Sequence, residues 1–334
     1  MNIETLIINQ NGTSAKHLAA QQFSEDIVHG LSANPKRLDS KYFYDTTGDG
    51  LFQDIMNCPE YYLTNCELEI FSEQTDALAN FIIADNDEPF DLIELGAGDA
   101  TKSSYLLKHL MNKGVDFTYL PIDISSHVIE LLDDELSKNI PGLKFHGLNG
   151  EYFDMLKKAA AISNRRKVVL FLGSNIGNMP IDKAESFCFD LRKSLSAGDM
   201  ALIGFDLKKN PKTILDAYND KAGITKSFNL NLLNRINREL DADFITSQFE
   251  HYPTYDPETG ACKSYLISLV DQQVHIRSAN KSINFQQNEY IFMEISQKFT
   301  VQQTKDIAIS SGFIPANYLF DAKSWFTDAV WIAK

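Results

Sequence analysis

A strand-like segment near the C-terminus, YIFMEISQKF at residues 290–299, carries a carboxylate and a hydroxyl two positions apart. Successive side chains of a strand point to opposite faces, so Glu294 and Ser296 share a face with Phe292 and Lys298. A carboxylate accepts hydrogen bonds, and a hydroxyl can donate or accept one. The alternation alone places this face in water, and a ligand on it is the alternative.

A glycine loop in IELGAGDATKSS is a second feature that could bind a ligand. Gly96 and Gly98 follow an apolar run, where glycine lets the chain turn tightly and approach a ligand closely. Thr101 stands where the dinucleotide fingerprint has its third glycine. An ordinary strand-to-helix turn is the alternative interpretation of the loop alone.

An acidic residue ends the next predicted strand. Asp123 lies about 25 residues after Gly98, where a carboxylate can accept hydrogen bonds from both ribose hydroxyls of an adenosine. It can also cap the helix that begins at Ser125, and the two roles are compatible. The missing third glycine, the C-terminal strand pair and an acidic residue after the third strand favour S-adenosylmethionine (SAM) over nicotinamide. Glu151 and Tyr152 are then the candidates to contact the adenine.

Alternating apolar runs and helical patterns must position these residues. The expected strands are 90–98, 117–123, 143–150, 167–178 and 198–207, and the helices between them are 101–114, 125–139 and 181–195. Such alternation predicts an α/β fold with a doubly wound parallel sheet of the class I SAM-methyltransferase type. The tail adds a strand at 290–299, a helix at 301–311 and two final strands, 312–320 and 325–334.

The chain is expected to have three regions. Residues 1–85 form a largely helical region that contributes to the substrate pocket, and residues 86–207 with 290–334 form the SAM-binding domain. Residues 208–289 form a helix and β-hairpin insertion that binds substrate, since such insertions often cover the C-terminal edge of the strands.

The bulk properties exclude several partners. A net charge of −14 and a pI near 4.9 disfavour nucleic acid. The four cysteines lack metal-ligand spacing, so no metal is expected and they indicate reduced thiols of a cytoplasmic protein. No signal peptide or membrane-spanning run is recognised.

Several motifs occur in one order along the chain. They are KYFYDTTGDGLF, PEYYLTNCELEI, ELGAGDATK, FLGSNIGN, DAYNDKAGITKSFNLNLLNRINRELDADF and MEISQKF. In this order they strongly resemble the histidine-specific Nα-methyltransferase family, whose known member makes hercynine in ergothioneine synthesis. The resemblance runs from about residue 20 to the C-terminus, and several motifs lie outside the generic SAM fold.

The resemblance implies roles for individual residues. The implied SAM contacts are Gly96, Ala97, Gly98, Lys102, Asp123, Glu151 and Tyr152, with Glu151 standing where the family usually has Asp. Asn178 matches the asparagine that holds the substrate α-amine, and Tyr44 matches a tyrosine of the amine site; both are assigned to catalysis. The implied substrate contacts are Gly173, Phe52 in the cavity wall, Tyr61 and Tyr218 at the α-carboxylate, and Glu294 and Ser296 at the imidazole.

One position departs from the family. Ser264 aligns with a hairpin position near the imidazole that is commonly Met. The resemblance therefore implies a SAM-dependent amino-acid N-methyltransferase acting on L-histidine, up to the trimethylated betaine. Another aromatic amino acid or derivative stays open as the substrate. A non-catalytic binding protein and an NAD-dependent dehydrogenase are more distant alternatives. A monomer is favoured, and no nucleic-acid or membrane partner is expected.

Overall fold

The protein is described here by a computed structural model that covers residues 3–83 and 88–334, with side chains from residue 18 onward in the first helix. It divides into two compact units. Unit 1 comprises Met1–Tyr61, Pro211–Asp256 and Cys262–Ile295, and unit 2 comprises Tyr62–Asn210, Pro257–Ala261 and Ser296–Lys334.

Unit 2 is built on an 8-stranded sheet with the order β13-β14-β7-β6-β2-β3-β4, and β5 also pairs with β3. Its strands are β2 (Phe90–Leu95), β3 (Phe117–Asp123), β4 (Lys144–Phe145), β5 (Leu148–Asn149), β6 (Arg166–Phe171), β7 (Met200–Asp206), β13 (Phe313–Phe320) and β14 (Phe326–Ala333). The strands from β2 to β7 pair in parallel, whereas β14 is antiparallel to both β7 and β13. The sheet is therefore mixed, and the expectation of a parallel sheet holds for its centre.

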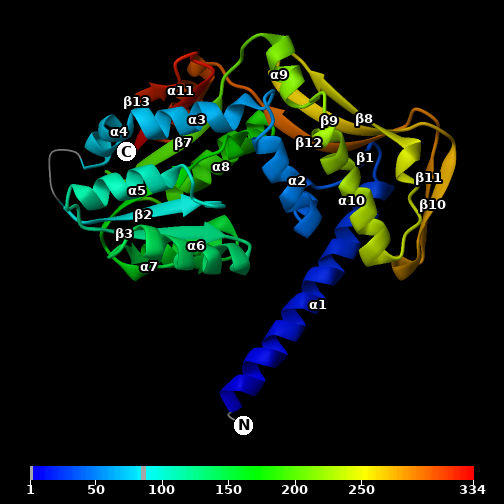
Figure 1. Cartoon of the computed structure of the whole chain (residues 1–334), viewed down its shortest axis with the longest axis horizontal. Helices are drawn as coiled ribbons and strands as arrows, with labels where there is room; N and C mark the ends of the chain where they lie inside the picture. Colours follow the sequence, from blue (N-terminus) through cyan, green and yellow to red (C-terminus); the bar gives the residue numbers. More distant parts are fainter. Residues whose placement is uncertain (1–2, 84–87) are drawn as a thin grey trace. The chain divides into compact units, whose positions relative to one another are not determined.

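Helices cover the sheet of unit 2 (Figure 1). They are α3 (Tyr62–Glu73), α4 (Thr75–Ile83), α5 (Ser103–Asn112), α6 (Ser126–Asn139), α7 (Tyr152–Ile162), α8 (Ile181–Lys193) and α11 (Val301–Ser310). Every residue of β2 is buried, as its continuous apolar run requires for a strand covered on both faces. One face packs against the apolar sides of α7, α8 and α11 around Phe171, Phe205 and Trp331.

Unit 1 combines helices with two small sheets (Figure 1). Its helices are α1 (Ile3–Ser32), η1 (Ser40–Phe43), α2 (Thr46–Met56), α9 (Pro211–Ala217), α10 (Ile224–Leu240), η3 (Thr246–Gln248) and η4 (Arg277–Ala279). One sheet has the order β1-β12-β9-β8, from β1 (Lys36–Arg37), β12 (Tyr290–Gln297), β9 (Ala261–Ser268) and β8 (Phe249–Tyr255). The other pairs β10 (Gln272–Ile276) with β11 (Lys281–Phe285). Phe228 and Leu232 of α10 lie in the core that joins these elements.

Most predicted elements are confirmed, and the differences have local causes. The strand expected at 143–150 is two short strands interrupted at the His146–Gly147 step, where the β3 pairing breaks. The strand expected at 167–178 ends at Phe171, and a 3-10 helix, η2 (Asn175–Asn178), follows a left-handed Ser174. The boundaries of the two compact units also differ from those of the three predicted regions, because α3 and α4 pack in unit 2. The roles assigned to those regions stay predictions.

Residues 290–297 of the predicted strand 290–299 form β12, but the second face of this segment is not the water-facing one that the alternation indicates. Ser296 is 8% exposed and Lys298 is fully buried at 0%. Glu294 is partly buried. No helix within residues 3–83 and 88–334 combines the length and apolarity needed to span a membrane.

Candidate active site

The glycine loop of unit 2 leaves β2 at the carboxyl edge of the sheet. Gly96 and Gly98 adopt left-handed backbone angles, with φ of 70° and 53°. The Asp123 carboxylate at the end of β3 accepts the backbone N–H of Ser125 at 2.9 Å and also that of Gly98. Burial raises the pKa of Asp123 above its ordinary value. The predicted ribose acid therefore lies beside the predicted glycine loop, and part of its surface remains exposed.

Tyr152 lies directly over the same loop. A Cβ at Gly96 would come within 2.7 Å of the Tyr152 hydroxyl, and the φ of +70° would strain any other residue at this position. Tyr152 begins α7, and its ring packs edge-on against Phe171 of β6. Glu151, just before it, is exposed. The structure thus brings Gly96, Asp123 and Tyr152 to one edge of the sheet.

The loop after β6 reaches the same edge. A Cβ at Gly173 would lie 3.6 Å from both the Lys102 ammonium and the Asn175 amide nitrogen, and that amide is equally close to Gly96. Asn178 ends η2, is exposed, and its amide donates weakly to Asn175 Oδ1 at 3.4 Å. Four of the sequence-predicted residues of unit 2, Gly96, Lys102, Gly173 and Tyr152, are thereby neighbours.

Glu67 of α3 is a component that sequence reasoning missed. It is 1% exposed, its carboxylate accepts the Gly173 backbone N–H at 2.8 and 2.9 Å, and it forms an ion pair with Lys102. Asp328 of β14 lies beside it fully buried, and burial followed by repulsion from Glu67 raises the pKa of Asp328 well above its ordinary value. Glu67 therefore fixes the Gly173 loop relative to Lys102. The only sequence signal was its place in the NCELEI motif.

Asp206 at the end of β7 is a second missed residue. It is fully buried and binds the Tyr62 hydroxyl at 2.8 Å, the Lys209 ammonium, and the Lys298 ammonium at 2.6 Å. Its backbone N–H donates to Ser174 Oγ at 3.1 Å, which ties this cluster to the loop that carries Asn178. We call Asp206, Tyr62, Lys209 and Lys298 the Asp206 cluster.

Unit 1 groups the predicted amine-site aromatics. The ring of Tyr44 lies 5.6 Å from that of Phe52, and both rings contact Phe228 of α10. Asp45 caps α2 through the Gly48 N–H at 2.7 Å and also binds the Asn231 amide and the Arg238 guanidinium, and these bonds hold α2 against α10.

The two tyrosines predicted for the carboxylate also lie together. The rings of Tyr61 and Tyr218 are 6.1 Å apart and nearly perpendicular. Tyr218 is buried at 7% exposure just after α9. Asp220 accepts the N–H groups of Ile224 and Thr225, in the first turn of α10, at 2.8 Å each. These bonds hold the turn that follows Tyr218 against the start of α10.

The residues predicted to recognise the side chain of the substrate lie on neighbouring strands. Ser264 on β9 is 1% exposed and pairs with Pro253 of β8, while Glu294 lies on β12, the next strand of the same sheet. His251 of β8 stays neutral near pH 7, because burial lowers the pKa of its imidazole to about 4.

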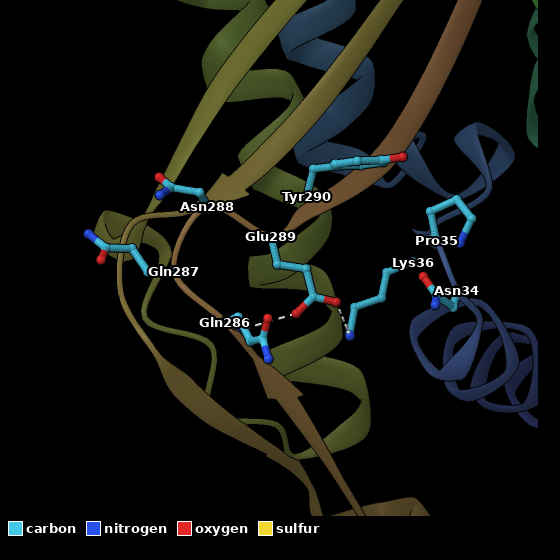
Figure 2. Close-up of a pocket in the computed structure, with 8 residues that line it drawn as sticks. All are labelled: Asn34, Pro35, Lys36, Gln286, Gln287, Asn288, Glu289 and Tyr290. Atoms are coloured by element: carbon cyan, nitrogen blue, oxygen red, sulfur yellow. Dashed lines mark hydrogen bonds and ion pairs between the residues drawn. The ribbon is translucent and has the colours of Figure 1, made fainter.

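A surface pocket of unit 1, of about 290 Å³, is separate from these residues. Figure 2 shows it between residues 34–36 and 286–290, with Glu289 directed at Lys36. None of the predicted site residues lines it. Among the described residues, no cluster of three or more His, Cys, Asp and Glu side chains could hold a metal ion.

The mixed α/β sheet, the glycine loop and the acid at the end of the neighbouring strand define the class as SAM-dependent methyltransferase. The model of one family, described as histidine-specific methyltransferase, SAM-dependent, matches residues 23–333. The chain belongs to this family.

Relatives of known name agree with that assignment. A histidine N-alpha-methyltransferase of Mycobacterium tuberculosis is 32% identical over 296 residues, which cover 89% of each chain. Ergothioneine biosynthesis protein 1 of Schizosaccharomyces pombe is 29% identical over 83% of this chain and 36% of that longer protein. A solved structure of magnesium protoporphyrin IX methyltransferase from Synechocystis, with bound SAH, aligns with 88% of this chain and 98% of its own at 11% identity and a TM-score of 0.44.

Proposed function

We propose that the enzyme transfers methyl groups from SAM to the α-amine of L-histidine, up to the trimethylated betaine hercynine of the ergothioneine pathway. The observation that carries the proposal is membership of the histidine-specific family over residues 23–333 together with the presence of Glu294 and Ser296. The histidine N-alpha-methyltransferase of M. tuberculosis aligns along 89% of its length, which supports the same substrate here.

The proposed cofactor site is the edge of unit 2 that carries the glycine loop. The residues fit SAM because Gly96 and Gly98 leave the backbone accessible, Asp123 offers a ribose acceptor, and Tyr152 offers a ring beside the loop. Ala97 and Glu151 are proposed to complete the adenosine contacts, and Lys102 is proposed to meet the amino-acid end. SAM supplies an electrophilic methyl group, so no acid is needed to activate the donor.

The proposed substrate contacts follow from the chemistry of an amino acid. The Tyr61 and Tyr218 hydroxyls are donors suited to the α-carboxylate, and their rings are already neighbours in unit 1. Asn178 can orient the α-nitrogen through its amide oxygen, beside Gly173. Phe52 supports the ring of Tyr44.

The protein's main task is to present a neutral amine. An α-amino group has a pKa near 7.7–8.0 in peptides, so it must lose a proton before each transfer. Tyr44 is 46% exposed, so its hydroxyl can pass this proton to water. The last methyl transfer forms a cation without an N–H, so the aromatic faces around Tyr44 are the groups that can favour it.

The alternative substrate is another aromatic amino acid or its derivative. It rests on Ser264, which is smaller than the Met common at that position and is 1% exposed. Glu294 argues for a ring that has an N–H to donate, which makes histidine the first choice. We also propose a cytoplasmic enzyme that works as a monomer on small molecules; the four buried free cysteines support the reducing location.

A substrate panel tests the proposal. The protein is incubated with SAM and each of the amino acids in turn, and products are read by mass spectrometry. We expect a gain of one to three methyl groups on L-histidine, with other amino acids at least about 100-fold slower because a site with buried hydrogen-bonding groups rejects rings that lack the partners. SAM binding without any methylated product would support the non-catalytic alternative. Nicotinamide binding without SAM binding would support the dehydrogenase.

A further inference from the structure

The Glu67 carboxylate of α3 bonds two separate loops at the edge of unit 2 that carries the glycine loop. Both of its oxygens accept the Gly173 backbone N–H, at 2.8 and 2.9 Å, and it also pairs with the Lys102 ammonium. Glu67 is 1% exposed, so water screens these contacts little. Gly173 follows β6 and Lys102 follows β2, so one side chain joins the loops that leave two neighbouring strands.

The Lys102 ammonium keeps the capacity to bind a ligand. An ammonium has three N–H donors, and the bond to Glu67 uses one of them. The Lys102 side chain is 23% exposed, and its nitrogen lies 3.6 Å from the place that a Cβ on Gly173 would occupy. Burial alone would lower the pKa of Lys102, but the charge of Glu67 raises this pKa above its ordinary value, so the ammonium stays charged. A fixed and charged donor at this edge suits the carboxylate of an amino acid.

Two other buried acids near this ion pair have reasons to be neutral. Burial, and then the charge of Glu67, raise the pKa of Asp328 on β14 well above its ordinary value. Glu94 of β2 accepts the Tyr119 hydroxyl at 2.5 Å, and burial raises the pKa of its carboxyl to about 7. Glu67, which bonds the ammonium directly, is therefore the counterion that holds Lys102.

We propose that Glu67 is a positioning residue that holds the Lys102 ammonium for the amino-acid end of SAM and, with the same carboxylate, fixes the loop that carries Asn178. The inference rests on the proposed function, in which Lys102 meets the amino-acid end of SAM and Asn178 orients the substrate amine. Asn178 ends η2, which begins two residues after Gly173, so the bond to the Gly173 N–H fixes the start of this loop. One side chain therefore sets the affinity for the methyl donor and the place of a group that aligns the acceptor.

Two ligands separate this role from a general support of the fold. S-adenosylhomocysteine (SAH) and 5′-methylthioadenosine share the adenosine and the sulfur, and only SAH has the amino-acid end. We expect Glu67→Gln to weaken SAH binding by at least about tenfold in calorimetry, because Lys102 loses its charged anchor. The Kd of methylthioadenosine should stay within twofold. Equal weakening of both ligands, or unchanged SAH binding, would overturn the proposal.

A comparison of Glu67→Gln with Glu67→Ala separates the two bonds of the carboxylate. The amide oxygen of Gln can still accept the Gly173 N–H, whereas Ala keeps neither bond. With SAM and L-histidine both saturating, we expect kcat to fall about tenfold in Glu67→Ala and to stay within about threefold in Glu67→Gln. The same kcat in both variants would contradict the role of the Gly173 bond.

The fold is expected to tolerate Glu67→Gln, because Asp328 can ionise beside Lys102 once the charge of Glu67 is gone, so that the buried ammonium keeps a counterion. Glu69→Gln is the matched control, since Glu69 lies on the same helix and accepts the Ala322 backbone N–H at 2.7 Å. It should leave both Kd values within twofold. If Glu67→Gln does not fold, Glu67→Asp, which keeps the charge on a shorter arm, replaces it, and the same difference between the two ligands is expected.

A double variant tests whether Glu67 acts through Lys102. Glu67→Gln combined with Lys102→Met should bind SAH no more weakly than Lys102→Met alone, and additive losses would contradict the proposal. Failure of the proposed function looks different. A wild-type protein that does not bind SAH would refute the cofactor site itself, whereas SAH binding that Glu67→Gln leaves unchanged would overturn only the positioning role.

Discussion

Glu294→Ala is expected to lower kcat/KM for L-histidine by roughly 100-fold, because the substrate ring loses a hydrogen bond to a charged, partly buried acceptor. Most of the loss should be in KM, since the ring lies away from the reacting nitrogen. The SAM Kd, measured by calorimetry, should stay within twofold.

Glu294→Gln separates charge from hydrogen bonding. Its amide oxygen can still accept the ring N–H, so we expect about a tenfold loss and thus partial recovery relative to Glu294→Ala. Glu289→Gln, which changes a carboxylate that pairs with Lys36 in the separate pocket of unit 1, is the matched control and should leave kinetics unchanged. Wild-type kinetics in Glu294→Ala would remove Glu294 from the site and open the choice of substrate.

Asp123→Ala is expected to weaken SAM binding by about 100-fold or more, because two ribose hydroxyls lose a charged acceptor at once. The KM for histidine, measured at saturating SAM, should change little. Asp154→Asn, at an exposed position of α7, is the control for removing a carboxylate near this edge, since the ion pair of Asp154 with Lys157 is long, at 3.9 Å. Unchanged SAM affinity in Asp123→Ala would reduce Asp123 to a helix-capping residue.

The affinity for SAM is expected to depend on pH through Asp123. Burial raises the pKa of Asp123 above the ordinary value of 3.8, so it takes up a proton at a higher pH than an exposed aspartate would. The protonated form accepts less well, so affinity should fall as pH drops through this raised pKa and be full above it. Asp123→Ala should show no such fall.

The sequence predicted the sheet of unit 2 well because its strands are buried on both faces. Consecutive apolar residues in β2 and β6 and the glycine turns after them mark each strand and its carboxyl end. The residues expected near SAM, from Gly96 to Tyr152, come directly after the ends of these strands. They lie close together in the structure because parallel pairing brings the carboxyl ends of the strands to one edge of the sheet.

The buried charged residues that hold this site in place could not be predicted from the sequence pattern. Glu67 and Gly173 are 106 residues apart, and Asp206 at the end of β7 meets Lys298, which follows β12 in the sequence. A carboxylate or lysine on the polar side of a helix or strand normally faces water, and only the packing shows that Glu67 and Lys298 are buried. Alternation in YIFMEISQKF predicted the correct strand but a water-facing Ser296, whereas Ser296 and Gln297 at the end of β12 are buried, with 8% and 2% of their surface exposed.

Product NMR on a reaction of the protein with SAM and L-histidine tests the central claim most directly. The account predicts new N-methyl signals coupled to the α-carbon, growing to nine equivalent protons on one nitrogen, with unchanged imidazole ring nitrogens. Methyl groups on a ring nitrogen, or no methyl signal from histidine while SAM is bound, would contradict it.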